Sequence, residues 1–163
     1  MKRIFCALLV VCILLGLCAC GKKQNAAVPH TYEDLTISLP ADFIDLSDEA
    51  FAAGLTFLQG LDPIAVNGMR EEKSVFAAYG LDLDLERYAK LVVLSNNLSN
   101  QPEKKDNVLT FSYEAVTDGV SYTYVVTLWE TKEAFWTVQA YCPTSDYTAV
   151  KDDIWEILSS VTV

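Results

Sequence analysis

Few residues of this sequence are of types that could do chemistry, and they are poorly placed for it. The single histidine, His30, precedes the first strand-like run, so the commonest general base is missing from the folded part. Acid pairs occur at Asp82/Asp84 and Asp152/Asp153, but helix capping explains the first and a solvated helix face explains the second. No phosphate loop, HExxH pair or GxSxG elbow is present. We therefore predict no catalytic residue, no metal site, no cofactor and no enzyme activity.

The chain begins with the organisation of an export signal. Lys2 and Arg3 precede an apolar run, Ile4–Leu17, that is shorter than the roughly 20 residues of a membrane-spanning helix. The run ends in the letters LCAC, which resemble the bacterial lipobox. The resemblance implies that residues 1–19 are a cleaved signal peptide and that Cys20 carries palmitate-type acyl chains, of which two or three suffice for anchoring. A plain signal peptide with an incidental cysteine, or an uncleaved anchor, are the alternatives.

The part of the chain from Cys20 onward predicts one folded domain on a polar tether. Residues 20–31 are polar, lack periodicity and are broken by Pro29, which is typical of a flexible linker. Residues 32–163 number about 130, the size of a single domain with one adequate core. The expected location is the extracytoplasmic face of the cell membrane, with membrane lipid as the partner of the acylated cysteine.

Charge limits the partners that this domain can have. The formal net charge is −10, and loss of the two basic residues of the signal makes it −12. Such a charge opposes binding to nucleic acid and to anionic lipid surfaces. We therefore expect no nucleic-acid partner. The charge can attract a basic partner or can simply keep the domain in solution.

The first half of the domain predicts short strands and two helices. Ser47 suits the cap of the first helix, on which Phe51, Leu55 and Leu58 share one face, and Gly60 suits its end. The expected elements are a strand at Leu35–Leu39, a helix over 48–59, two short edge strands near 64–69 and 73–79, and a helix from Asp82 to about Asn97.

The second half predicts an antiparallel meander with one strongly apolar face. Asp118-Gly119 lies between two strand-like runs and is a strong hairpin signal. With these as the two turn residues, Tyr113 faces Tyr124 and Leu109 faces Leu128, and a one-residue slip would separate the apolar faces.

The second turn of the meander and the closing helix follow the same logic. A three-residue turn, Thr131-Lys132-Glu133, would place Leu128 opposite Trp136 and so keep the apolar faces together. A helix capped near Asp146 then closes the domain. Its expected buried stripe is Tyr147, Val150, Ile154, Ile157 and Leu158, followed by an extended tail over 159–163.

Two features of the meander are candidates for function. Cys142 lies on the apolar face with Trp136, so we predict a buried, inert thiol rather than a reactive one. On the opposite face, Trp129 and Phe135 are directly paired in the expected register. Either the helix over 48–59 covers these two aromatic residues, or they form an exposed patch for a protein partner.

The order of elements resembles the PsbP-like fold, which is shared with Mog-type Ran-binding proteins and with many bacterial lipoproteins of unknown function. The resemblance rests on the strand ending at Pro40, the helix beginning at Asp84, the segment Phe135–Gln139 and the closing helix around Trp155. It implies an α+β fold, an α/β/α sandwich around an antiparallel sheet, but no site residues. We expect a protein-interaction or assembly module; the alternative is a carrier of a small apolar ligand held between the sheet and a helix layer.

Overall fold

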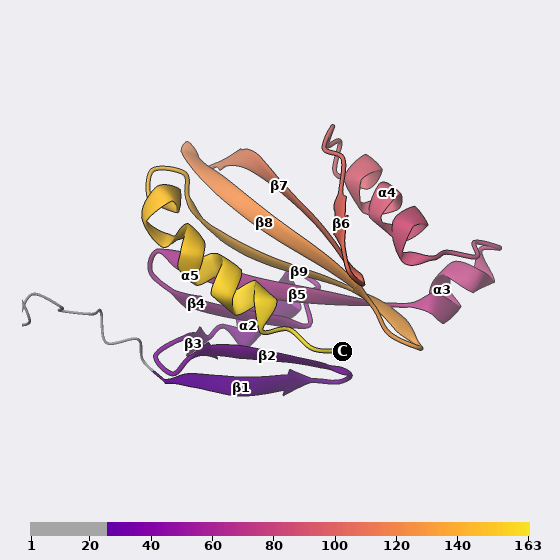
Figure 1. The fold of residues 1–163 in the computed structure, drawn as a ribbon, viewed down its shortest axis with the longest axis horizontal. Coiled ribbons are helices and arrows are strands. Elements are labelled where there is room, and N and C mark those ends of the chain that lie inside the picture. Colours follow the sequence, from indigo (N-terminus) through magenta and orange to yellow (C-terminus); the bar gives the residue numbers. More distant parts are fainter. Residues whose placement is uncertain (1–25) are drawn as a thin grey trace, which may run out of the picture.

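The computed structural model describes residues 26–163 (Figure 1). Cys20 and the predicted signal peptide, residues 1–19, lie outside the described residues. The fold class expected from the sequence is confirmed: it is α+β, with antiparallel sheets flanked by helices. The described residues 26–163 contain no helix that is both long and apolar enough to cross a membrane.

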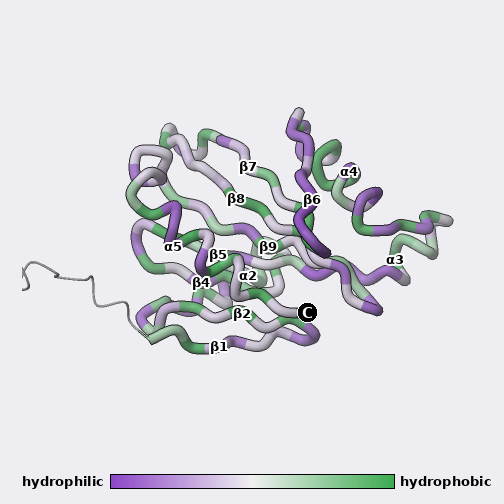
Figure 2. Tube along the Cα trace, in the orientation of Figure 1, coloured by the Kyte–Doolittle hydropathy of each residue, from purple (hydrophilic) through white to green (hydrophobic). Residues whose placement is uncertain are grey.

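A seven-stranded sheet is the centre of the molecule, and every neighbouring pair of its strands is antiparallel. In spatial order its strands are β3 (Ile44–Asp45), β4 (Phe57–Leu61), β5 (Ile64–Glu72), β9 (Ala134–Pro143), β8 (Val120–Glu130), β7 (Val108–Thr117) and β6 (Glu103–Lys105). The edge strand β6 is charged throughout, as its hydrophilic colour in Figure 2 shows, and such an edge resists pairing with another chain.

One face of the sheet is covered by a hairpin and the last helix. The hairpin consists of β1 (Ala27–Tyr32) and β2 (Leu35–Pro40), and helix α5 (Tyr147–Ser159) lies beside it (Figure 1). We call this side the α5 face. Its core contains Leu35, Ile37, Leu39, Trp136, Val138, Cys142, Ile154 and Leu158, all of them almost wholly buried.

The β1–β2 hairpin corrects the predicted extent of the tether. Residues 27–31 were expected to belong to a flexible linker, but they form most of β1 and pair with β2 along its whole length. The reason is that β2 buries alternate residues against α5 and leaves its outer edge open, which β1 then fills. Within the described residues, regular structure therefore begins at Ala27 and not at residue 32.

The other face of the sheet is covered by α4 (Leu85–Ser95), with the short helix α3 (Lys73–Ala78) at its end. We call this side the α4 face. Tyr88 and Phe135 are fully buried there and their rings stack at 4.5 Å. The closing helix buries most of the stripe predicted for it, and α4 lies within the helix predicted from Asp82 to about Asn97.

The hairpin of β7 and β8 has the predicted register. Tyr113 pairs with Tyr124 and Leu109 pairs with Leu128. Asp118 and Gly119 both have positive φ, at 52° and 80°, as a two-residue turn of this kind requires.

The predicted register of the second turn is wrong by one residue. Trp136 pairs with Trp129, and Leu128 pairs with Thr137, because the turn has two residues, Lys132-Glu133. The N–H of Thr131 closes this turn by donating to the carbonyl of Ala134 at 2.9 Å. Both faces of β9 are buried, so Phe135 enters the core of the α4 face while Trp136 enters the core of the α5 face. Matching apolar faces therefore could not identify the correct register.

Two further predictions in the first half were wrong. The helix expected over 48–59 is only α2 (Ser47–Ala52), and Ser47 does not cap it; residues 57–61 form strand β4 instead. Phe51, expected on the buried face, is 88% exposed. The two edge strands expected near 64–69 and 73–79 are one inner strand, β5, followed by α3.

Candidate functional site

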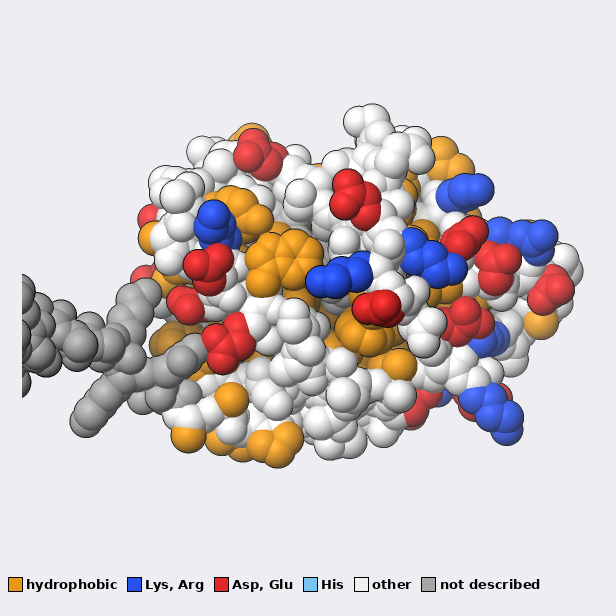
Figure 3. Space-filling view, viewed as in Figure 1, with side chains coloured by type: hydrophobic (Ala, Val, Ile, Leu, Met, Phe, Trp, Pro, Cys, Tyr) orange, Lys and Arg blue, Asp and Glu red, His pale blue; other side chains and the backbone are white. Residues whose placement is uncertain are grey.

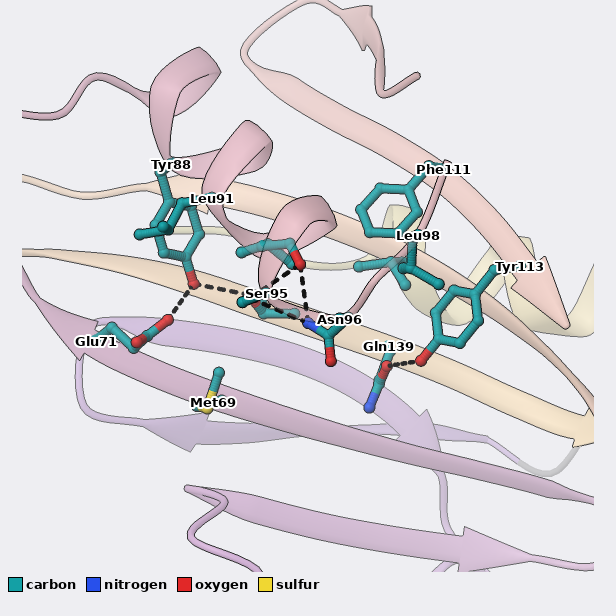
Figure 4. Close-up of a pocket in the computed structure, with 13 residues that line it drawn as sticks. Met69, Glu71, Tyr88, Leu91, Ser95, Asn96, Leu98, Phe111, Tyr113 and Gln139 are labelled. Atoms are coloured by element: carbon teal, nitrogen blue, oxygen red, sulfur yellow. Dashed lines mark hydrogen bonds between the residues drawn. The ribbon is translucent and has the colours of Figure 1, made fainter. Parts of the chain in front are cut away.

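Helix α4 covers only part of its face of the sheet and leaves a cavity beside it. The cavity has a volume of about 360 Å³ and lies between α4 and strands β5, β7, β8 and β9 (Figure 4). We call it the α4 cavity. Its lining consists of Met69, Glu71, Tyr88, Leu91, Val92, Ser95, Asn96, Leu98, Phe111, Tyr113, Val126, Thr137 and Gln139.

The position of α4 follows from its sequence. Asp84 caps the helix, and its side chain accepts a hydrogen bond of 2.8 Å from the backbone N–H of Arg87. Leu85, Tyr88 and Ala89 share the buried face and pack the helix onto the sheet. Beyond Ser95 the helix ends, so the sheet further along has no helical cover and the cavity opens there.

A polar group lies at the closed end of the α4 cavity. The Tyr88 hydroxyl donates a hydrogen bond of 2.7 Å to Oε2 of Glu71 and is 2.8 Å from Oγ1 of Thr137 (Figure 4). Burial raises the pKa of Tyr88. The hydrogen bond to Glu71 and the negative charge of the Glu71 carboxylate raise this pKa further. The phenol therefore stays neutral and acts as a donor, and Glu71 is fixed in place by it.

A second set of polar side chains lies toward the open end. Tyr113 donates to Oε1 of Gln139 at 3.4 Å. The Asn96 side-chain NH₂ donates to the backbone carbonyl of Val92 at 2.8 Å, and Figure 4 shows its oxygen pointing away from the helix into the cavity. Apolar side chains line the cavity between its two polar ends, so the cavity suits a molecule with an apolar body and polar ends.

A row of three tyrosines begins at the cavity wall with Tyr113 and continues along the α4 face. Tyr113, Tyr124 and Tyr141 come from adjacent strands and form a row, with ring centroids 4.7 Å and 5.0 Å apart. We call them the tyrosine row; all three are half-buried. The middle ring has a neighbour stacked on each face, so Tyr124 offers solvent its edge and hydroxyl and not an open ring face.

The predicted patch of Trp129 and Phe135 does not exist as a surface. Phe135 is fully buried under α3 and α4. Trp129 lies on the α5 face, where its Nε1 donates to Oγ1 of Thr127 at 3.1 Å. The one-residue change of register puts the two rings on opposite faces of the sheet. Of the two alternatives, Phe135 is covered, but by α3 and α4 and not by the helix expected over 48–59.

Sequence reasoning did not find the α4 cavity. The only available signal was Tyr88, a residue with a polar tip in the middle of an otherwise apolar helix stripe. A buried tyrosine hydroxyl needs a hydrogen-bond partner, which indicates a polar group on the facing sheet. No pattern in the sequence showed that this partner is Glu71, because its strand was predicted to end at residue 69.

A second cavity, of about 570 Å³, lies on the opposite side of the sheet. It is bounded by α5, the end of β2 and the turn between β4 and β5. Phe43, Ile64 and Ile157 supply apolar walls, and Asp62 is among the acidic side chains of the lining. Within residues 26–163, no group of His, Cys, Asp and Glu side chains could hold a metal ion.

Comparisons with known proteins give a likeness of fold without a family. No protein-family model matches the sequence, and no curated protein matches it either. A solved structure from Bacteroides thetaiotaomicron is similar, with a TM-score of 0.56 at 13% identity; the match covers 86% of this chain and 48% of that one. This chain thus spans about half the length of that protein, and the likeness shows the fold alone.

A second solved structure is cyanobacterial PsbP (CyanoP) from Synechocystis sp. PCC 6803. Its TM-score is 0.46 at 11% identity, and the match covers 91% of this chain and 99% of that one. The structural neighbours therefore include a PsbP protein, at a likeness too low to carry an argument about function.

Proposed function

We propose that this chain is a lipoprotein of the PsbP-like type, anchored through Cys20 to the extracytoplasmic face of the cell membrane. The LCAC run after a basic pair and an apolar segment supports the anchor. In this proposal the domain binds a small molecule with an apolar body in the α4 cavity. Its role is binding and not catalysis.

The α4 cavity is the observation that carries this proposal. Its volume of about 360 Å³ lies within the range of small-molecule sites, roughly 300–1,000 Å³. Leu91, Leu98 and Phe111 give it apolar walls, and fixed polar groups stand at its two ends. Of the two functions expected from the sequence, a ligand carrier fits a cavity between the sheet and a helix layer.

A methyl signal of Met69 provides the test. The sequence has two methionines, Met1 and Met69, and removal of the signal peptide leaves Met69 alone, in the wall of the cavity. We would label its methyl group with ¹³C in the lipidated chain held in nanodiscs and titrate with 1-hexanol, a neutral apolar probe. The proposal expects a saturable shift of the Met69 signal.

Two variants on α4 decide whether the shift comes from the cavity. Ser95→Phe places a ring at the cavity lining and should weaken hexanol binding about tenfold or more, since the ring occupies the space of the ligand. Leu94→Phe adds a ring on the same helix at a side chain that is 71% exposed, and should change binding less than about twofold. Absence of any Met69 shift, or equal effects of the two variants, would reject the α4 cavity as a ligand site.

A protein-interaction module is the second candidate, and the tyrosine row favours it. Half-buried tyrosines on an uncovered stretch of sheet are typical of protein interfaces. A photo-crosslinking amino acid at Tyr124, in the native cell, should give a discrete crosslinked partner. The same residue at Trp155, which is exposed on α5, should not. Crosslinks of equal yield at both positions would count against a specific partner on the row.

A further inference from the structure

Among the described residues that line the α4 cavity, Glu71 alone has a charged side chain. One of its carboxylate oxygens, Oε2, accepts the Tyr88 hydrogen bond described above. Its other oxygen, Oε1, has no hydrogen-bond or ion-pair partner among residues 26–163. The cavity therefore contains a carboxylate that is held in one orientation and has a free acceptor atom.

The basic side chains closest to Glu71 in sequence are paired elsewhere. Arg70 lies on the opposite face of β5, where it bonds Asp34 at 3.0 Å and also contacts Glu72. Lys73 pairs with Glu130 at 2.7 Å and donates to the backbone carbonyl of Thr131. Within the described part of the chain, no lysine or arginine forms an ion pair with Glu71. A partly buried carboxylate of this kind favours a positive ligand group.

The side-chain oxygen of Asn96 is a second acceptor in the cavity, and it also favours a ligand group that donates hydrogen bonds. Because the Asn96 NH₂ group is used by the carbonyl of Val92, the side-chain oxygen is the part of Asn96 left for a ligand. Glu71 on β5 and Asn96 at the end of α4 both border the space shown in Figure 4. An ammonium group carries three donors and no acceptor, so it is a suitable partner for the free oxygen of either side chain.

The net charge of the chain favours a cationic ligand over an anionic one. The described residues from Ala26 to Met69 contain acidic side chains but no lysine or arginine. In Figure 3, basic side chains on the visible face gather toward the α3–α4 end, where acidic ones are interspersed with them. The excess of acids over bases in the whole chain attracts cations and repels anions.

We propose that the α4 cavity binds the protonated amine of a small apolar molecule, with Glu71 as its counter-ion. The apolar body of the ligand lies against Leu91, Leu98 and Phe111, and its ammonium group bonds Oε1 of Glu71. This inference rests on the proposed function, because it specifies the ligand of the same cavity. It predicts discrimination by charge among molecules of equal size.

Three six-carbon probes separate charge from size: 1-hexylamine, 1-hexanol and hexanoate. The lipidated chain in nanodiscs is titrated with each probe and the ¹³C-methyl signal of Met69 is followed. Affinities are calculated from the free probe concentration after its partition into empty nanodiscs has been measured, so that different probes can be compared. In the wild type, hexylamine should bind roughly tenfold tighter than hexanol, and hexanoate more weakly than both.

The decisive variant is Glu71→Gln, which removes the charge and keeps an acceptor for Tyr88. It should weaken hexylamine about tenfold and leave hexanol within about twofold. Glu114→Gln is the matched control, since Glu114 is exposed on β7 and faces away from the α4 cavity. It should alter neither affinity. Asn96→Asp adds a second carboxylate to the cavity and should tighten hexylamine severalfold, which keeps the test valid if Glu71→Gln fails to fold.

The outcomes distinguish the two proposals. If hexanol binds, but Glu71→Gln does not weaken the binding of hexylamine more than that of hexanol, the amine inference is overturned. The proposal that the cavity binds a ligand would then still stand. Tighter binding of hexanoate than of hexylamine would overturn the inference as well. If none of the probes shifts the Met69 signal, the ligand-binding function itself fails.

Discussion

At the scale of single residues, the thiol of Cys142 illustrates how burial controls reactivity. Its side chain is wholly buried in the core of the α5 face, which confirms the burial predicted from the sequence. Burial raises the pKa of Cys142, and the nearby charge of Asp146 adds to this effect. The thiol is thus both inaccessible and mostly protonated near neutral pH.

We expect slow modification of Cys142 by iodoacetamide in the native state and fast modification after unfolding in guanidinium chloride. Mass spectrometry of timed samples at pH 8 measures both rates. The native rate should be lower by about a hundredfold or more, because a local opening must precede reaction. Similar rates in the two states would contradict the buried position.

Gly68 has a different constraint, imposed by a neighbouring aromatic ring. A Cβ atom at this position would lie 2.1 Å from Cε1 of Phe57, whose ring is stacked on Tyr32. Gly68→Ala should therefore lower the free energy of unfolding by about 1–3 kcal/mol, since Phe57 must move. Gly60→Ala is the control, because its Cβ would meet nothing nearer than 3.5 Å. Equal denaturation midpoints of the two variants would show that Phe57 adapts without cost.

At the scale of elements, strand β9 divides two cores between consecutive residues. Phe135 and Trp136 are both fully buried, one on each face of the sheet. Phe135→Ala and Trp136→Ala should each cost about 3–5 kcal/mol in urea unfolding, because each removes a large core side chain. Trp155→Ala on exposed α5 surface should cost about 0.5 kcal/mol or less. A small cost at either β9 position would contradict the two-sided burial of the strand.

In addition to its apolar packing, the β1–β2 hairpin is linked to the sheet by hydrogen bonds to the carboxylate of Asp34. Oδ1 of Asp34 accepts from Trp136 Nε1 at 2.8 Å and from Arg70 Nε at 3.0 Å. Burial opposes ionisation of Asp34, but hydrogen bonds from Arg70, Thr131 and Trp136 outweigh it and lower its pKa to about 2. The folded state therefore binds the proton less readily than the unfolded state, whose carboxyl has an ordinary pKa near 4.

The sign of the pH effect follows from this difference. Stability from Asp34 is present above about pH 4 and is lost as the pH falls from about 4 to about 2. Asp34→Asn should remove this contribution, about 1 kcal/mol after allowance for solvent screening, and should flatten that part of the stability profile. Asp118→Asn, at an exposed turn, should leave the profile as in the wild type. Parallel profiles of Asp34→Asn and wild type between pH 5 and pH 2 would rule out this role.

At the scale of the whole molecule, the early start of β1 changes how the domain is held. If Cys20 is the lipidated residue, six residues separate it from Ala27, where β1 begins. Six extended residues span at most about 20–22 Å, so the domain stays close to the membrane.

Cys20→Ser should release the protein from the membrane fraction or leave it as an unprocessed precursor, since the acyl chains are then missing. Cell fractionation followed by intact-mass analysis measures both outcomes. Cys12→Ser, within the apolar run, is a control that should leave lipidation unchanged. An unmodified Cys20 in the wild-type mass would remove the basis of the anchor.

Local signals in the sequence determined the elements that depend on neighbours in the chain. The turn at Asp118-Gly119 and the alternation on either side specified the register of β7 and β8, because a slip would expose one whole apolar face. Likewise, the stripes of α4 and α5 follow from helical spacing, and the tail bridges Thr36 through Thr162. These features need no knowledge of distant residues.

Only the tertiary structure decided the features that depend on what covers the sheet. Both faces of β9 are buried, so alternation carries no information there, and the position of Phe135 depends on α3 and α4. Similarly, residues 57–61 have apolar positions at helical spacing but pair with β5 as a strand. The α4 cavity exists because α4 ends at Ser95 above a wider sheet. Glu71 faces it because β5 continues to Glu72, and no local pattern encodes either fact.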